Sequence, residues 1–392
     1  MPNLNRRALF ATTGAALTLA AAKADAAGAA EALTDLRGHV GLFPRLPLLD
    51  MESRGDFMLG MSIMNNGDMQ RAANARAQEI LKSHGVKPDE KMQFEKAIAL
   101  LSPDPVLAAY AKSRSTHQGI KYRMLQTELH KRADQYLAAL EAADKAGPGM
   151  VEFTGLNAPE YTRREIHTQP GGYVGDPFAG YMYRYGTDWG VLTGRNYQDE
   201  SHKALAGNVP VPTDGKVKRV LDLGTSIGQL ATSMKLRFPD AEVWGIDAGA
   251  PMVRYAHLKA VDMGLAVNFS DRLAEDTKFP DNHFDIVTAN ILFHEVTAEA
   301  AKKIVAEVGR VLRPGGVFYP TDFYTNALPP STAWQHFQAF WNHRWNNEDW
   351  MLEYATVDLN AEMRKSGMTI SAGNETTFAL RPPGKNVVGT KV

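Results

Sequence analysis

Two aspartates and two glycines in the second half of the chain have the types and spacing of a nucleoside-binding site. Asp222 and Gly224 end an apolar run, and Gly228 directly precedes a helical run. Glycines let the backbone approach a ligand closely, and the free N–H groups of the following helix attract polar groups. Asp247 ends the next apolar run, where a carboxylate can accept hydrogen bonds from both ribose hydroxyls. We therefore predict that a nucleoside cofactor lies over this turn.

The spacing of the glycines distinguishes two kinds of cofactor. A dinucleotide fold needs G-x-G-x-x-G, which places a helix N-terminus against a pyrophosphate. Gly224 and Gly228 do not have that spacing, so the turn opposes a nicotinamide-dependent reductase, which we keep as an alternative. The order Asp222-x-Gly224-x-Ser226-x-Gly228 instead resembles the D-x-G-x-G-x-G motif of class I methyltransferases. Ser226 stands where that family usually has a glycine.

Further segments resemble one branch of that family, in the same order along the chain. Residues 274–287, AEDTKFPDNHFDIV, are similar to the third and fourth motifs of the ubiquinone and menaquinone methyltransferases. Residues 290–296, NILFHEV, resemble that family's strand exit, and residues 312–316, LRPGG, resemble the turn before its fifth strand. Motifs in register are hard to obtain by chance, and here they extend from Lys218 to Tyr319.

The resemblance implies a methyltransferase whose cofactor is S-adenosylmethionine. In that family an aspartate two residues before Glu275 commonly meets the adenine amine, and Leu273 takes this position here. We therefore expect backbone groups near Ala274 and Glu275 to meet the adenine. The full set of expected cofactor-binding residues is Asp222, Gly224, Thr225, Ser226, Gly228, Asp247, Ala248, Met252, Ala274, Glu275, Asn290 and Ile291.

His294 lies in the segment that resembles the strand exit, and it is the candidate catalytic residue. Ligands of open α/β sheets bind at the carboxyl ends of the strands, where a base speeds proton removal from a hydroxyl by about 10²–10⁴-fold. The alternative is that His294 is a satisfied polar group at a core edge. Glu295 is expected to be solvated or to cap a helix. His, Asp and Glu residues lack metal-ligand spacing, so we predict no metal site.

Aromatic residues are dense between Trp334 and Tyr354. Trp334, Phe337 and Trp341 fall on one face of a predicted helix. This face packs either onto the sheet or against a bulky, largely apolar or aromatic methyl acceptor, and we expect a mixture of the two. The candidate acceptor-binding residues are Tyr173, Tyr185, Trp334, His336, Trp341 and Trp345.

The segments that carry these residues alternate short β-rich runs with helical runs, which predicts a parallel sheet with helices on both faces. We expect an α/β, doubly wound, Rossmann-like fold with a seven-stranded sheet, the class I methyltransferase fold, in which the last pair of strands closes the sheet in antiparallel fashion. The expected strands are Arg219–Leu223, Glu242–Ile246, Ala266–Phe269, Phe284–Ala289, Val317–Tyr319, Met368–Glu375 and Asn386–Thr390. The expected helices between them are Gln229–Arg237, Ala250–Met263 and Ala298–Leu312.

The chain is long enough for more than one domain. Residues 27–150 carry apolar residues at helical spacing and are expected to form a helical N-terminal domain. Residues 151–215 are predicted to be an irregular, Tyr- and Gly-rich connection that covers the cofactor. Residues 216–392 are predicted to be the S-adenosylmethionine-binding domain, with an aromatic insert at residues 326–366.

The composition favours a small molecule as the partner. The formal net charge is −1, and basic residues form no block outside the extreme N-terminus, so we expect no nucleic acid. The chain has no cysteine, which excludes disulfides, thiolate metal sites and a cysteine nucleophile. We expect no stable membrane insertion, and the sequence leaves the oligomeric state open.

The first residues have the order of a secretory signal. Arg6 and Arg7 precede a mildly apolar stretch, and Ala24-Asp25-Ala26 supplies a cleavage site, so residues 1–26 resemble a twin-arginine signal peptide. The prediction is export to the periplasm, and the alternative is an alanine-rich tail on a cytoplasmic protein. Export conflicts with a cofactor made in the cytoplasm. It therefore leaves a further alternative, an exported small-molecule-binding protein that keeps the methyltransferase fold without turnover.

Overall fold

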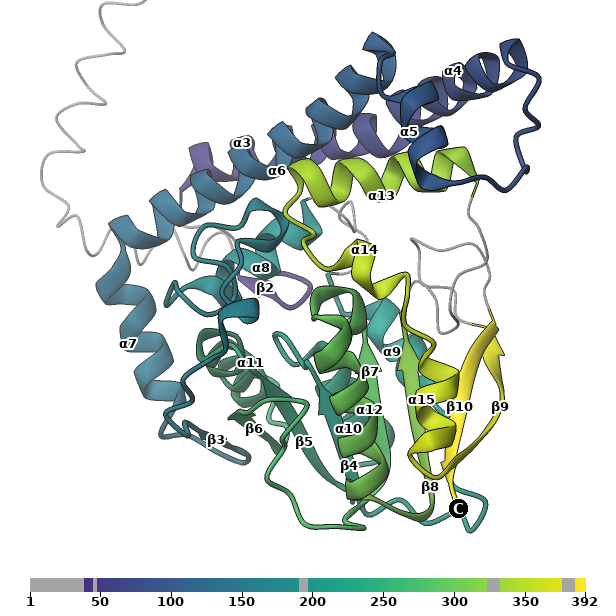
Figure 1. Cartoon of the computed structure of the whole chain (residues 1–392). Helices are drawn as coiled ribbons and strands as arrows, with labels where there is room; N and C mark the ends of the chain where they lie inside the picture. The colour runs from purple at the N-terminus through teal and green to yellow at the C-terminus, as the bar shows by residue number, and fades with distance from the viewer. Residues whose placement is uncertain (1–38, 45–47, 190–196, 323–331, 376–384) are drawn as a thin grey trace, which may run out of the picture. The chain divides into compact units, whose positions relative to one another are not determined.

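The computed structural model describes residues 39–44, 48–189, 197–322, 332–375 and 385–392 (Figure 1). The predicted signal, residues 1–26, lies outside these ranges. Contacts divide the chain into two compact units, Met1–Phe57 and Met58–Val392. In the first unit β1 (His39–Val40) and β2 (Phe43–Pro44) form an antiparallel pair. Helix α3 (Leu49–Met64) begins in this unit, and the candidate site lies wholly in the second.

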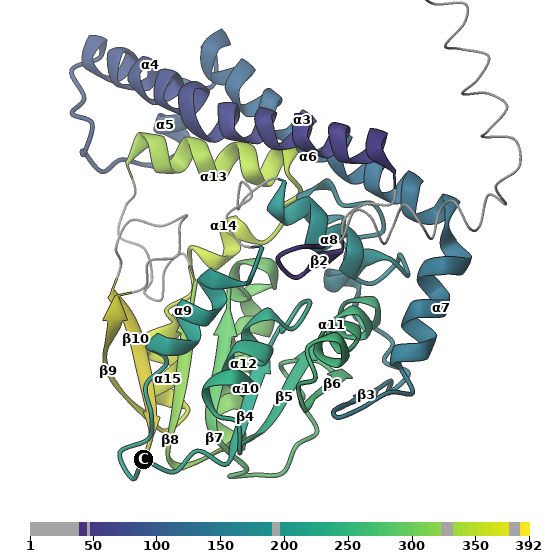
Figure 2. The same cartoon turned by 180° about the vertical axis from the view of Figure 1, so that it is seen from behind.

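An eight-stranded sheet forms the centre of the second unit, with the order β3-β6-β5-β4-β7-β8-β10-β9 (Figures 1 and 2). All neighbouring strands pair in parallel except for β10, which is antiparallel to both β8 and β9. The strands are β3 (Met150–Glu152), β4 (Arg219–Leu223), β5 (Glu242–Asp247), β6 (Val267–Asp271), β7 (Phe284–Asn290), β8 (Leu312–Thr321), β9 (Met368–Glu375) and β10 (Lys385–Lys391).

The strand order confirms the predicted doubly wound α/β fold. From β4 the chain runs outward through β5 and β6, then returns to the other side of β4 with β7 and β8. Loops that follow β4 and β7 therefore leave the sheet in opposite directions, and the crevice between them is where open α/β sheets bind ligands. The sheet has one strand more than predicted, because β3 pairs with the outer edge of β6. This strand of three residues directly follows Gly147-Pro148-Gly149, and it is too short to give a periodic signal.

Helices cover both faces of the sheet, as expected. Residues of α10 (Gln229–Arg237) and α11 (Ala250–Asp262) share a core with one face, and those of α12 (Ala298–Val311) and α15 (Leu359–Lys365) share a core with the other. The side chains of β8 show the alternation that a two-sided strand requires: Phe318 belongs to the α12 core, and its neighbours Val317 and Tyr319 to the α10 core.

A second core joins the N-terminal helices to the aromatic insert. Helix α13 (Ala333–Trp345) lies beside α5 and α6 in both views, and its side chains Phe337 and Trp341 pack among Leu81, Leu101 and Tyr110 (Figures 1 and 2). The aromatic face was expected to pack partly on the sheet and partly against a methyl acceptor, and the first part of that expectation is wrong. It packs on α4 (Gln70–Ser83), α5 (Phe94–Leu101) and α6 (Pro105–Lys131), and α7 (Ala133–Ala143) follows these helices in the chain.

The segment predicted to be irregular, residues 151–215, contains two helices, α8 (Ala179–Asp188) and α9 (Glu200–Asn208). Helix α8 was not predicted because it contains two glycines, and glycine lowers helix propensity. Both glycines of α8 are needed for packing: a Cβ on Gly180 would lie 2.3 Å from Tyr255 Cβ, and one on Gly186 would lie 2.3 Å from the Tyr122 ring. Among the described residues, no helix combines the length and apolarity needed to cross a membrane.

Candidate active site

The turn between β4 and α10 begins at a buried carboxylate. Asp222 accepts hydrogen bonds from the hydroxyls of Thr225 and Thr288, each at 2.7 Å. Burial disfavours the charge and raises the pKa of Asp222 to about 6, although both hydroxyls act in the opposite direction. The carboxylate therefore stabilises the turn through hydroxyl donors and not through a basic side chain.

The backbone of the turn opens toward the carboxyl edge of the sheet. Gly224, Ser226 and Gly228 have φ values of +59°, +52° and +77°. Ser226 thus occupies a left-handed conformation that glycine adopts without strain, which explains why the related motif has a glycine at this position. The N–H of Ser226 donates a hydrogen bond of 2.9 Å to Asp247 Oδ2, and so joins the turn to the end of β5.

Asp247 is held in one orientation by the backbone on both sides. Its Oδ1 accepts the Gly249 N–H at 2.9 Å, while its Oδ2 accepts the Ser226 N–H. Burial raises the pKa of Asp247 to about 6, and both backbone N–H groups oppose this. Each oxygen keeps a lone pair, and the residue is only half-buried. The anchored carboxylate can therefore accept hydrogen bonds from a ribose, so the residues fit a nucleoside cofactor. We call Asp222, Gly224, Ser226, Gly228 and Asp247 the cofactor cradle.

The other predicted cofactor-binding residues surround the cradle at the carboxyl ends of the strands. Ile291 is strained, with φ +58° and its N–H bound to the Thr321 carbonyl at 2.7 Å. Asn290 Oδ1 accepts the Thr321 hydroxyl at 2.8 Å. Ala248 links Asp247 to α11, and Met252 is buried beneath Gly249. After β6, Ala274 enters the core, whereas Glu275 accepts the Tyr161 hydroxyl at 2.5 Å.

His294 lies beyond the cradle in a buried ion pair. Its Nδ1 lies 2.8 Å from Asp322 Oδ1, and Asp322 Oδ2 accepts the N–H of Phe293 at 2.8 Å. Burial alone lowers the pKa of His294, but the charge of Asp322 and the hydrogen bond to it raise that pKa to about 9. The Asp322 carboxylate therefore favours the charged form of the ring.

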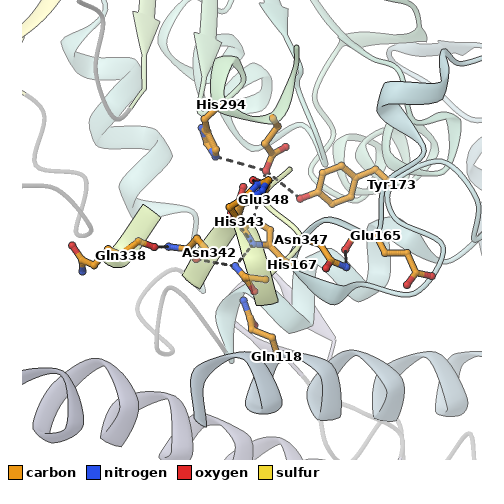
Figure 3. A network of polar contacts seen from close by, with 12 residues as sticks. Gln118, Glu165, His167, Tyr173, His294, Gln338, Asn342, His343, Asn347 and Glu348 are labelled. Carbon is orange, nitrogen blue, oxygen red and sulfur yellow. Dashed lines mark hydrogen bonds and ion pairs between the residues drawn. The ribbon is translucent and has the colours of Figure 1, made fainter. Parts of the chain in front are cut away.

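Further polar side chains gather around Glu295, and Figure 3 labels His167, Tyr173, His294 and Glu348 among them. Its Oε1 lies 3.4 Å from the Tyr173 hydroxyl, 3.5 Å from His167 Nε2 and 3.9 Å from His294 Nε2. The other nitrogen of the His167 ring, Nδ1, lies 3.1 Å from Glu348 Oε1. Hydrogen bonds of catalytic groups are often long until a ligand binds. We call this group the polar cluster: His167, Tyr173, His294, Glu295, Asp322 and Glu348.

The polar cluster adjoins the cofactor cradle. A Cβ on Gly249 would lie 2.6 Å from the Tyr173 carbonyl oxygen, so the backbone of the cluster touches the loop after Asp247. The charge of Glu295 also raises the pKa of Asp247, as expected for neighbouring carboxylates. The structure thus brings the predicted residues His294 and Tyr173 to the cradle.

Most of the polar cluster was missed in the sequence. Asp322 follows β8 directly, and the rule that ligands bind at the carboxyl ends of strands was enough to find it. Glu295 was expected to be solvated or a cap, whereas it lies at the centre of the cluster. His167 and Glu348 lie in short segments without a periodic pattern, and no local signal marks them.

The remaining candidate acceptor-binding residues are not brought to the polar cluster. Trp341 is 3% exposed in the helical core, and Trp334 and Trp345 pack around it. His336 Nε2 lies 3.0 Å from the Met92 carbonyl, and Tyr185 is buried against Trp189. This placement favours a structural role for these side chains over acceptor binding. Within the described ranges, His, Asp and Glu residues form no group suited to a metal ion.

Comparison with known proteins confirms the resemblance for the cofactor-binding part. Residues 220–316 match the family model described as a methyltransferase domain. The demethylmenaquinone methyltransferase of Thermus thermophilus is 42% identical over 106 residues, which are 27% of this chain and 47% of that protein. The ubiquinone/menaquinone biosynthesis C-methyltransferase UbiE of Psychromonas ingrahamii is 31% identical over 128 residues, 32% of this chain and 50% of that protein. The chain thus spans about half the length of these relatives.

Solved structures are similar over a comparable region. The PH0226 protein of Pyrococcus horikoshii is 25% identical with a TM-score of 0.30, covering 36% of this chain and 60% of that one. Magnesium protoporphyrin IX methyltransferase from Synechocystis, solved with bound SAM, is 15% identical with a TM-score of 0.35 and covers 52% of this chain and 82% of that one.

Proposed function

We propose that this protein is an S-adenosylmethionine-dependent methyltransferase that acts on a small molecule. One observation carries the proposal: the segment that matches a methyltransferase domain contains the cradle, where Ser226 and Gly249 orient Asp247 as a ribose-binding group. The names of the relatives point to acceptors related to quinones. For this chain we propose a small, largely apolar or aromatic acceptor, because the rings of Tyr183 and Tyr354 lie against Tyr173 and His294 of the polar cluster.

The cofactor cradle and the polar cluster have separate roles in the proposed reaction. When bound, the cofactor supplies an electrophilic methyl group on a sulfonium. The cradle binds and orients its nucleoside, and positioning of this kind provides effective molarities of about 10⁵ M or more. We propose that His294, paired with Asp322, orients Glu295 and offsets its negative charge; its role as the base predicted from the sequence stays a prediction.

Mass spectrometry of small molecules released from the purified protein tests the function directly. We expect S-adenosylmethionine or S-adenosylhomocysteine to co-purify, and calorimetric titration to show that both bind. A bound nicotinamide would instead support a reductase. Cofactor binding without methyl transfer to any acceptor would favour the binding protein without turnover.

We also propose that the chain is exported, on the strength of Arg6-Arg7 and Ala24-Asp25-Ala26 alone. The mature protein in its native host is then expected to begin at or near Ala27, which N-terminal sequencing measures. Replacement of both arginines by lysine is expected to keep the protein inside the cell. Recovery of protein that retains Met1 from the cytoplasm alone would contradict export.

A further inference from the structure

We propose that Glu348 binds the methyl acceptor by accepting a hydrogen bond from a hydroxyl or amino group of that molecule, and that His167 is the residue that positions Glu348. The inference rests on the methyltransferase function proposed above, and it names the substrate class of the same site. Tryptophans of the aromatic insert were expected from the sequence to contact the acceptor, whereas this proposal gives that contact to Glu348, which follows α13.

The two oxygens of Glu348 have different surroundings. Oε1 faces His167 Nδ1 at 3.1 Å. Oε2 is buried and has no hydrogen-bond partner among the described residues, and the whole residue is only 4% exposed. An unsatisfied buried polar group costs about 1–3 kcal/mol, and more when it is charged. A ligand that donates a hydrogen bond to Oε2 removes this cost, whereas a ligand with only acceptor oxygens adds to it.

His167 bridges two carboxylates and so fixes which oxygen of Glu348 stays free. Its Nδ1 faces Glu348 at 3.1 Å and its Nε2 faces Glu295 at 3.5 Å, so a ring protonated on both nitrogens places its positive charge between the two acids. The amide nitrogen of Asn346 also lies 3.1 Å from Nδ1. Burial lowers the pKa of His167, but the two glutamates reverse this and raise it overall. The backbone of His167 has φ +56°, a conformation that surrounding contacts must maintain.

The segment that carries Glu348 is anchored on both sides. Helix α13 before it is fixed in the helical core through Phe337 and Trp341. Asn347, with φ +55°, donates from Nδ2 to the Glu165 carbonyl at 2.9 Å, which ties this segment to the one that carries His167. Such strain persists only where the surroundings impose it, and it gathers at ligand-binding sites. The aromatic face thus contributes to the acceptor site indirectly, because its packing fixes the position of the segment that carries Glu348.

The acceptor class can be tested with small probes before the acceptor is known. Phenol and anisole form one matched pair, and aniline and N,N-dimethylaniline form another; in each pair only the first member donates a hydrogen bond. Ligand-observed NMR titrations use the full chain loaded with S-adenosylhomocysteine. We expect phenol and aniline to bind at least about tenfold more tightly than their methylated partners, since a hydrogen bond to a charged group is worth about 1.5–3 kcal/mol.

Glu348→Gln and Asp349→Asn form the test variant and its control. Asp349 is the adjacent acid, but it is partly exposed and paired with Arg164. We expect Glu348→Gln to abolish the preference for the donor probes and Asp349→Asn to retain it. In NMR titrations of ¹⁵N-labelled histidine, Glu348→Gln should lower the pKa of His167, because it removes one of two neighbouring charges, and Asp349→Asn should leave it in place.

The outcomes separate this inference from the proposed function. Failure of the wild-type protein to bind S-adenosylhomocysteine would refute the function itself. If the cofactor binds but the wild type does not prefer phenol and aniline, or if Glu348→Gln keeps that preference, the assignment of Glu348 is overturned alone. A parallel loss of cofactor affinity in Glu348→Gln would show that its role is structural. Glu348→Gln with wild-type cofactor affinity and no donor preference supports the inference.

Discussion

The cofactor cradle and the polar cluster are neighbours, but they are built in different ways. The cradle comes from one continuous piece of chain, β4, α10 and β5, and backbone N–H groups hold its Asp247. The polar cluster takes its side chains from four separate segments, at residues 167–173, 294–295, 322 and 348. On the proposed function, a local structure would hold the cofactor, whereas the acceptor would meet residues that the fold brings together from distant parts of the chain.

The two regions also differ in how they stabilise their carboxylates. Asp222 and Asp247 rely on hydroxyl and backbone donors, and burial raises the pKa of each to about 6. In the polar cluster, His167 and His294 provide positive charge beside the acids. The cradle is therefore suited to a ligand that brings its own hydrogen-bond donors or positive charge, while the cluster is largely compensated before a ligand arrives.

The largest expected effect comes from breaking the buried pair of the polar cluster. Asp322→Ala leaves His294 without its partner in a site where the pair is 2% and 0% exposed. Removal of one partner of a buried ion pair typically costs about 3–5 kcal/mol. Urea unfolding should show a loss of that size. Glu362→Gln, which breaks the surface pair with Lys365, is the control and should change stability by less than about 1 kcal/mol. Equal effects would mean that the cluster is not a compensated ion pair.

Stability should respond to pH in two separate windows, one for each region. Folding raises the pKa of Asp222 from 3.8 to about 6, so its contribution is present at low pH and is lost as the pH rises through 6. Folding raises the pKa of His294 from 6.5 to about 9, so its contribution is complete below pH 6.5 and is lost as the pH rises through 9. The groups that face His294 are Asp322, Glu295, Glu348 and His167.

The shifts of Asp222 and His294 each correspond to about 3 kcal/mol, because one pKa unit is worth about 1.4 kcal/mol. Unfolding free energies measured between pH 4 and 10 should show both losses in the wild type. Asp222→Asn should remove its own share of the loss in the lower window and leave the share of Asp247, whose pKa is also raised to about 6, and Asp322→Asn should reduce the loss in the upper window. A variant that alters the window of the other region would show that the two regions titrate as one unit.

Cofactor affinity should depend on the cradle and not on the cluster. Asp247→Ala removes a charged acceptor of the proposed ribose contact, worth about 1.5–3 kcal/mol, so affinity for S-adenosylmethionine should fall at least about tenfold. Calorimetric titration measures this. Asp262→Asn, a partly exposed acid on α11 that pairs with Lys259, is the control and should bind as the wild type does. Wild-type affinity of Asp247→Ala would disprove the ribose assignment.

The same contrast explains what the sequence revealed. Strands, covering helices and cradle follow from local periodicity and turn chemistry, and β4 and α10 have the predicted bounds. The destination of the aromatic face was not predictable, because an apolar stripe shows that a surface is buried but not what covers it. Glu348 and His167 meet across a large separation in sequence, and only the anchoring of α13 on α5 and α6 brings them together. Residues of that kind carry no local signal.

The smallest expected effect concerns Ser226, the one departure of the cradle from the related motif. Its φ of +52° is costly for a residue with a Cβ, while its contact with Asp247 uses only the backbone N–H. Ser226→Gly relieves the strain but leaves a more flexible unfolded chain, so its net effect should stay below about 1 kcal/mol. Ser226→Ala keeps the strain and loses the hydroxyl, which is buried and has no hydrogen-bond partner among the described residues.

We therefore expect Ser226→Gly to be more stable than Ser226→Ala by about 1 kcal/mol in thermal or urea unfolding, and both variants to bind S-adenosylmethionine as the wild type does. The two variants lack the hydroxyl equally, so their difference isolates the backbone. If both lose cofactor affinity to the same extent, the serine hydroxyl itself contacts the ligand. In that case the cradle, like the polar cluster, depends on a side chain particular to this protein.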